Sequence, residues 1–174
     1  VYLGDLQDHD TQLDNVHRLT LDERDDEPLC WARDSRVVYF RSDRGGTFDV
    51  FKQGIDEPTA DKIIEAPGLE RQAMLSPDGS LLLYTTTDPD RLMRVPVAGG
   101  PPELVVDLKD DAGFDCPMSP HASCVLIHRE DGKLSFVSLD PRNGRGRTIN
   151  ESPALMGFTG AWSVSPDGSR LAFI

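Results

Sequence analysis

One phrase, Ser-Pro-Asp-Gly-Ser, occurs twice in the chain, at residues 76–80 and again at residues 165–169. Alignment of the whole sequence on the aspartate of this phrase gives four copies, with the anchor positions Asp34, Asp78, His121 and Asp167. Successive anchors are 44, 43 and 46 residues apart. Because three near-equal intervals indicate internal repetition, the chain is predicted to consist of repeated modules.

The repeated phrase predicts a turn between two strands. Proline presets φ at the first corner of a turn, aspartate accepts a hydrogen bond from its own backbone, and glycine tolerates a positive φ. Large apolar residues follow the anchor at its fourth and sixth positions, as Leu82 and Tyr84 do, and such positions share one face of a strand. The predicted structural turn residues are Asp34, Pro77, Asp78, Gly79, Pro120, Pro166, Asp167 and Gly168.

Two further short strands follow the hairpin in each full period, separated by loops rich in glycine, aspartate and proline. No apolar pattern with the period of a helix is sustained along the chain. Four short strands in a period of about 44 residues are typical of a β-propeller blade. The predicted fold class is therefore all-β, a β-propeller of four-stranded antiparallel blades.

The predicted domain is a single partial β-propeller over residues 1–174, with roughly four blades' worth of strands. Its parts are the last strands of a preceding blade at 1–21, blades at 28–65, 72–106 and 114–149, and the first strands of the next blade at 160–174. A lone blade cannot bury both faces, so the blades are expected to stack around an axis. Both a closed four-bladed ring and a segment of a larger ring agree with this count.

Two tryptophans and two cysteines have predicted structural roles. Trp31 and Trp162 are expected to pack between blades, with the stacking of a sugar or base as the alternative. Cys116 and Cys124 flank a predicted turn, so they either form a disulfide across the hairpin or remain buried thiols. A disulfide would favour an extracytoplasmic location.

Composition restricts the partners. The formal net charge is −12, from 30 acidic and 18 basic residues, which argues against nucleic acid because phosphates require clustered Lys and Arg. No apolar run approaches the roughly 20 residues of a membrane span. The expected partner is a protein or a small molecule bound at a propeller face.

The sequence contains no motif that indicates catalysis or cofactor binding. G-x-S-x-G, H-E-x-x-H, a phosphate-binding glycine loop and a dinucleotide fingerprint are all absent. The acidic cluster at 22–27 lacks the glycine of a calcium loop. His9, His17, His121 and His128 are expected in loops or on strand surfaces. No catalytic, cofactor-binding or metal-binding residue is predicted, and the chain is not expected to be an enzyme.

The segment from His17 to Gln53 resembles the TolB-like propeller repeat. That repeat has an Arg-Leu-Thr strand, then Pro-x-Trp-Ser-Pro-Asp-Gly, an apolar strand, Ser-Asp-Arg-x-Gly and an aromatic-Asp strand; this chain reads RLTL, PLCWARDS, VVYF, SDRGG and FDVF. The third unit departs most, since His121 and Ala122 replace aspartate and glycine. The repeat resembles those of six- to eight-bladed rings, so the resemblance implies a fragment of such a ring.

Four further stretches, FDVFKQ, RLMRVPVAGGPPELV, FDCPMSPHASCVL and GRGR, are similar to propeller regions of large bacterial proteins that carry a Ser/Thr kinase or a winged-helix domain. The resemblance implies a non-catalytic binding scaffold, either the sensory or interaction propeller of a bacterial signalling protein or a TolB-like periplasmic protein. The alternatives are the non-catalytic propeller of a prolyl-oligopeptidase-type serine peptidase and a lactonase-type propeller enzyme.

Overall fold

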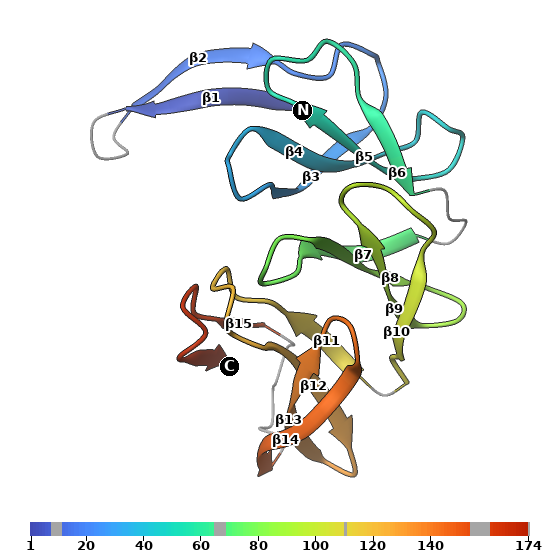
Figure 1. The fold of residues 1–174 in the computed structure, drawn as a ribbon, viewed down its shortest axis with the longest axis vertical. Helices are drawn as coiled ribbons and strands as arrows, with labels where there is room; N and C mark the ends of the chain where they lie inside the picture. Colours follow the sequence, from blue (N-terminus) through green and yellow to red (C-terminus); the bar gives the residue numbers. More distant parts are fainter. Residues whose placement is uncertain (8–11, 65–68, 110, 154–160, 174) are drawn as a thin grey trace. The chain divides into compact units, whose positions relative to one another are not determined.

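The computed structural model describes residues 1–7, 12–64, 69–109, 111–153 and 161–173 (Figure 1). Over these ranges the regular secondary structure is β-strand alone, so the predicted all-β fold class is confirmed. The chain divides into two compact units, Val1–Leu69 and Glu70–Ile174.

The strands of the first unit are β1 (Tyr2–Gln7), β2 (Gln12–Arg18), β3 (Asp26–Trp31), β4 (Val37–Ser42), β5 (Asp49–Gly54) and β6 (Asp61–Ile64). β1 and β2 form a two-stranded antiparallel sheet, and β3 to β6 form a four-stranded antiparallel sheet in chain order. On the larger sheet the rings of Phe40 and Phe51 stack with their centroids 5.9 Å apart. The Arg44 guanidinium lies over both rings, 5.1 and 4.6 Å from their centroids.

The strands of the second unit are β7 (Leu69–Leu75), β8 (Leu81–Thr86), β9 (Arg91–Pro96), β10 (Glu103–Asp107), β11 (Asp111–Asp115), β12 (Cys124–Glu130), β13 (Lys133–Asp140), β14 (Gly144–Pro153), β15 (Trp162–Val164) and β16 (Leu171–Phe173). β7 to β10 form one four-stranded sheet, β11 to β14 form another, and β15 pairs with β16. In every sheet, strands that follow one another in the chain lie side by side.

An apolar cluster joins the two four-stranded sheets of the second unit. Its buried members are Leu83, Leu92, Leu108, Phe114, Cys124, Leu126, Val137 and Leu139. Both sheets contribute to this set, so each covers an apolar face of the other. Full burial of one such side chain stabilises the fold by about 1.5–3 kcal/mol, and the cluster is therefore the main attraction between the sheets.

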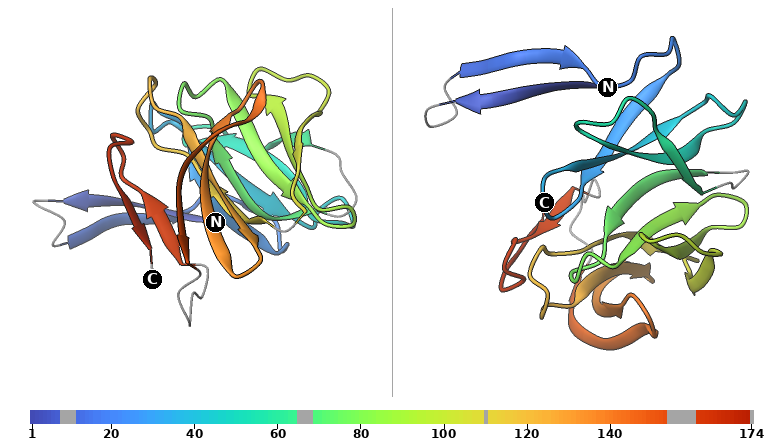
Figure 2. Two further views of the ribbon diagram at one scale, coloured as in Figure 1. Left: turned by 90° about the horizontal axis from the view of Figure 1, so that it is seen from below. Right: turned by 45° about the horizontal axis from the view of Figure 1, so that its top comes forward.

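A second apolar cluster joins β15 and β16 to the β11–β14 sheet, beside which they lie in Figure 2. Its buried members are Val125, Ile127, Leu134, Phe136 and Val164, with Trp162 and Leu171 packed against them. The sheets of this unit therefore pack in chain order, each against the next.

Half-buried polar side chains add directed contacts between the same sheets. The Asp115 carboxylate on β11 accepts hydrogen bonds from the Val164 backbone nitrogen at 2.7 Å and the Ser163 hydroxyl at 3.1 Å. The Gln72 side-chain amide on β7 donates to the Phe114 carbonyl at 2.7 Å. These bonds fix the register of one sheet against the next, which apolar contact alone does not.

The two tryptophans differ in burial. Trp162 packs against the second apolar cluster, between two sheets. Trp31 is 46% exposed, and its packing between blades stays a prediction. It is the last residue of β3, an edge strand of its sheet.

The three four-stranded sheets span residues 26–64, 69–107 and 111–153, which overlap the predicted blades at 28–65, 72–106 and 114–149. The paired strands β1–β2 and β15–β16 lie within the predicted segments 1–21 and 160–174. Assembly of all five sheets into a single ring stays a prediction.

Substitution of Gly168 should destabilise the second unit more than substitution of Gly132. Both glycines lie in hairpin turns, with φ of +75° and +73°, so alanine costs about 1 kcal/mol at either position. A Cβ at Gly168 would also lie 2.5 Å from the Ala122 Cβ, whereas a Cβ at Gly132 meets nothing within 4 Å. We expect a loss of about 2–4 kcal/mol for Gly168→Ala and about 1 kcal/mol for Gly132→Ala in urea unfolding. Equal losses would contradict the packing of these two turns.

Candidate functional site

The four repeat copies form four similar turns. In each, the backbone nitrogen of the fourth residue donates to the carbonyl of the first, over 2.8–3.1 Å; the turns are Ala32–Ser35, Ser76–Gly79, Ser119–Ala122 and Ser165–Gly168. The fourth residue has a positive φ in three of them, namely Ser35, Gly79 and Gly168. Glycine adopts this conformation without the steric cost that a side chain brings, which explains its place in the repeated phrase.

The aspartate of the phrase gathers hydrogen bonds within its own turn. Asp78 Oδ1 accepts from the Ser76 hydroxyl at 2.6 Å, the Ser80 backbone nitrogen at 3.0 Å and the Ser80 hydroxyl at 2.8 Å. The Ser76 hydroxyl in turn accepts from the Leu81 nitrogen at 3.0 Å. We call this set of bonds the aspartate network. It assigns both serines a structural role.

Asp167 forms the same network with Ser165 and Ser169. Hydrogen bonds from Ser76 and from the Ser80 backbone hold the pKa of Asp78 far below its usual range. Those from Ser165 and Ser169 lower the pKa of Asp167 to about 2. Asp34 accepts one bond of this kind, from the Arg36 nitrogen at 3.0 Å, because Ala32 and Arg36 stand where the other turns have serines.

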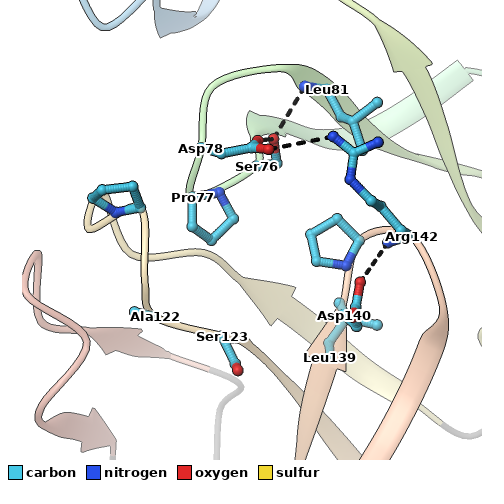
Figure 3. Close-up of a pocket in the computed structure, with 11 residues that line it drawn as sticks. Ser76, Pro77, Asp78, Leu81, Ala122, Ser123, Leu139, Asp140 and Arg142 are labelled. Carbon is cyan, nitrogen blue, oxygen red and sulfur yellow. Dashed lines mark hydrogen bonds and ion pairs between the residues drawn. The ribbon is translucent and has the colours of Figure 1, made fainter.

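Three turns of the second unit enclose a hollow of about 260 Å³ (Figure 3). They are the β7–β8, β11–β12 and β13–β14 turns, and the residues that line the hollow are Ser76, Pro77, Asp78, Leu81, Pro120, Ala122, Ser123, Leu139, Asp140, Pro141 and Arg142. We call this hollow the turn pocket. Pro77, Pro120 and Pro141 form part of its wall, beside Leu81 and Leu139, so much of the lining is apolar and conformationally restricted.

Arg142 connects two of these turns across the mouth of the turn pocket. Its Nη2 donates to the Ser80 hydroxyl at 2.9 Å and to Asp78 Oδ2 at 3.3 Å, as Figure 3 shows for the carboxylate. Its backbone nitrogen donates to Asp140 Oδ1 at 2.7 Å. That bond and those from Asn143 lower the pKa of Asp140. The pocket therefore combines an apolar wall with two carboxylates and one guanidinium at its mouth.

The predicted turn residues are not all in one place. Pro77, Asp78 and Pro120 line the turn pocket, and Gly79 belongs to the same turn as Asp78. The residues of the fourth turn, Pro166, Asp167 and Gly168, lie in the β15–β16 hairpin and are exposed, and Asp34 belongs to the first unit.

Cys116 and Cys124 form a disulfide with an S–S distance of 2.01 Å. The two half-cystines enclose the β11–β12 turn, which carries Pro120, Ala122 and Ser123 into the wall of the turn pocket. The spacing of the two cysteines left open either a disulfide or two buried thiols, and the structure contains the disulfide.

A buried ionic group was missed by sequence reasoning. The Asp111 side chain is fully buried; it pairs with His128 Nδ1 at 3.0 Å and with Arg145. His128 Nε2 also faces Glu130 at 3.4 Å. His128 is a half-buried residue of β12, and its contact with Asp111 was not visible in the sequence because that partner comes from β11 in the folded sheet. His9 lies outside the described residues.

A hollow of about 340 Å³ in the first unit is lined by Thr20, Asp22, Arg44 and Gln53, among others. Arg44 pairs there with Asp22 at 3.2 Å and with Asp26 at 3.1 Å, whereas Asp22 Oδ1 and Asp26 Oδ2 are buried without a hydrogen-bond partner among the described residues. Most of the lining side chains of this hollow are polar, unlike the apolar wall that is usual in binding sites. We therefore regard the turn pocket as the stronger candidate site.

Within the described ranges, no group of three or more His, Cys, Asp and Glu side chains is placed to hold a metal ion. In the same residues there is no helix with the length and apolar character that a membrane crossing requires.

No protein-family model matches the chain, and no curated protein matches it. Among solved structures it is similar to a TolB protein from Agrobacterium tumefaciens, with 16% identity and a TM-score of 0.65 over 99% of this chain and 70% of the other. For TolB from Acinetobacter baumannii the identity is 15% and the TM-score is 0.66, over 90% of this chain and 39% of the other. For the β-propeller domain of the Trilobed protease from Pyrococcus furiosus the identity is 11% and the TM-score is 0.55, over 76% of this chain and 44% of the other.

Similarity at these identities shows the fold. The chain has the fold of a β-propeller built from four-stranded antiparallel blades, as predicted, and a fragment of a larger ring fits the 39–70% of the two TolB chains that it spans. The resemblance to TolB-like propellers is supported at the level of architecture.

Asp78→Asn should weaken the fold at neutral pH more than in acid. The folded pKa of Asp78 lies below the value near 3.9 of an unfolded aspartate, so its contribution is complete above about pH 4 and is lost as the pH falls towards the folded pKa. We expect a decrease of a few degrees in Tm at neutral pH, with a difference from wild type that shrinks in acid. Thermal unfolding followed by circular dichroism across this range measures it.

Ser80→Ala is the control for this experiment, because it removes a hydroxyl donor but keeps the carboxylate and the backbone donor. We expect Ser80→Ala to lower Tm less than Asp78→Asn does, with the same direction of pH dependence. A loss for Asp78→Asn that is constant with pH would show that the ionised carboxylate does not stabilise the turn.

Proposed function

We propose that this chain is the non-catalytic binding propeller of a bacterial extracytoplasmic protein, and that it holds a partner protein at the turn pocket. The observation that carries the proposal is the pocket itself, a hollow with proline and leucine side chains in its wall and a few charged groups at its mouth. Concave apolar sites with a few convergent polar groups are the usual form of binding sites, and loops on a rigid scaffold are their usual position.

The size of the turn pocket favours a side chain of a partner protein over a free small molecule. Its volume of about 260 Å³ lies below the range of about 300–1,000 Å³ that is typical of small-molecule sites. An apolar side chain of a partner would contact the proline and leucine wall. Asp78 and Arg142, whose side chains are 46% and 59% exposed, would then face the polar backbone beside it.

The polar groups of the pocket support binding without catalysis. Ser76 is 3% exposed and its hydroxyl donates to Asp78, while Asp140 accepts bonds from the backbone of Arg142 and Asn143. A nucleophile needs a base that accepts its proton and a free path to the substrate. Here the hydroxyl and both carboxylates serve the turns. Turnover of lactone or ester substrates by the purified chain would contradict this part of the proposal.

The disulfide between Cys116 and Cys124 supports an extracytoplasmic location, because disulfides persist in oxidising compartments. We propose a parent protein of the signalling type, with a kinase or winged-helix domain elsewhere, or a TolB-like periplasmic protein. The similarity to the propeller of the Trilobed protease favours one alternative, the non-catalytic propeller of a peptidase.

Filling the turn pocket should abolish partner binding. Ser123 is exposed and lines the pocket, so Ser123→Trp would occupy the space of an incoming side chain. Peptides would be selected from a random library on the wild-type chain, and their affinities measured by fluorescence anisotropy. We expect the Ser123→Trp variant to bind the selected peptides about tenfold more weakly or worse, which is the effect of losing one well-packed contact.

Lys133→Trp is the matched control. Lys133 is exposed at the β12–β13 turn, at the other end of the sheet that carries the β11–β12 and β13–β14 turns, so the same bulk is added away from the pocket. Its peptide affinities should stay at the wild-type level. Selected peptides that bind Ser123→Trp as tightly as wild type would place binding elsewhere and overturn the proposal.

A further inference from the structure

The third turn lacks the aspartate network. His121 stands at the anchor position and Ala122 follows it, where the second and fourth turns have aspartate and glycine. The bond from the Ala122 nitrogen to the Ser119 carbonyl, 3.1 Å, still closes the turn. However, imidazole at this position cannot reproduce a carboxylate that accepts several donors at once. This turn therefore needs another source of order.

The cysteine pair is found in this copy and in no other. Cys116 and Cys124 stand five residues before and three residues after the anchor. The same two positions are occupied in the other copies by Leu29 and Val37, Ala73 and Leu81, and Trp162 and Arg170. The disulfide thus occurs in the one copy whose anchor is not aspartate.

The disulfide encloses the turn on the side of the protein core. Its Cα–Cα distance is 4.2 Å. Cys124 is fully buried in the first apolar cluster and Cys116 packs against it. Such a bond restricts the ends of the loop 117–123 and reduces the conformations open to it.

The position of this loop matters beyond its own hairpin. Pro120, Ala122 and Ser123 form one wall of the turn pocket. The Ala122 Cβ also lies within 2.5 Å of where a Cβ would stand on Gly168, and the Pro117 ring is 3.3 Å from the same point. Movement of the loop would therefore change the shape of the pocket and its packing against the next hairpin.

We propose that the Cys116–Cys124 disulfide replaces the aspartate network as the element that orders the third turn, and that it thereby positions the 117–123 wall of the turn pocket. The statement that this wall belongs to a binding site rests on the proposed function. The ordering of the turn does not, because it follows from the repeat alignment and the contacts of the loop.

The test restores the repeated phrase in the third turn and removes the disulfide independently. The variant is His121→Asp with Ala122→Gly, which re-creates the Ser-Pro-Asp-Gly-Ser sequence. Wild type and variant are compared with and without dithiothreitol. This reagent supplies the two electrons and two protons that convert the S–S bond to two thiols, and it is oxidised to a cyclic disulfide. Tm and hydrogen exchange of residues 117–123 are measured.

Reduction of wild type should lower Tm by about 5 °C or more and increase exchange in 117–123. The double substitution should recover roughly half of that Tm loss and restore protection in the reduced protein, while changing the oxidised protein little. Asp167→His is the matched control, since it places histidine at the anchor of a turn without a disulfide. The decrease in Tm caused by Asp167→His should be the same with and without reductant.

Equal effects of the double substitution in oxidised and reduced protein would overturn the proposal, as would unchanged exchange in 117–123 on reduction. If reduction unfolds both proteins, the aspartate network cannot replace the disulfide and the proposal is rejected. If only wild type unfolds, it is supported. None of these measurements uses a partner, so their failure is distinguishable from loss of peptide binding by Ser123→Trp.

Discussion

A β-sheet with apolar residues on both faces must cover each face with another sheet, and this requirement organises the second unit. The cluster around Leu83, Phe114 and Leu126 brings the β7–β10 and β11–β14 sheets together. Since each sheet is a meander, their packing also brings the ends of the hairpins together. The turn pocket is a consequence of that packing: three turns from two sheets meet there.

Local turn chemistry then determines how well defined the pocket wall is. Asp78 uses a carboxylate to organise serine hydroxyls and backbone nitrogens within a few residues, a device that depends on sequence neighbours alone. The third turn, with a histidine in that place, is enclosed by a covalent bond. The two devices have the same effect on a hairpin, because each fixes the loop ends from which the strands continue.

The repeat made the fold predictable, while the site depended on contacts that the repeat does not encode. Turn positions and strand faces follow from local spacing, so the hairpins could be located in advance. Arg142 and Asp78 are 64 residues apart, and only the packing of two sheets brings them together. The pairing of Asp111 with Arg145, 34 residues apart, is hidden for the same reason.

The contact between Arg142 and Asp78 is made by exposed groups, whereas the sheets beneath it are joined by apolar side chains. Dissolved ions shield opposite charges at a surface, and strongly hydrated salts such as sulfate reinforce apolar burial. Rising ionic strength would therefore release the Arg142 guanidinium from the turn that carries Asp78. The packing of the two sheets would stay as stable or become more stable. Rising salt thus weakens the charged contact at the mouth of the turn pocket, whereas it leaves the apolar packing of the sheets beneath unchanged or strengthens it.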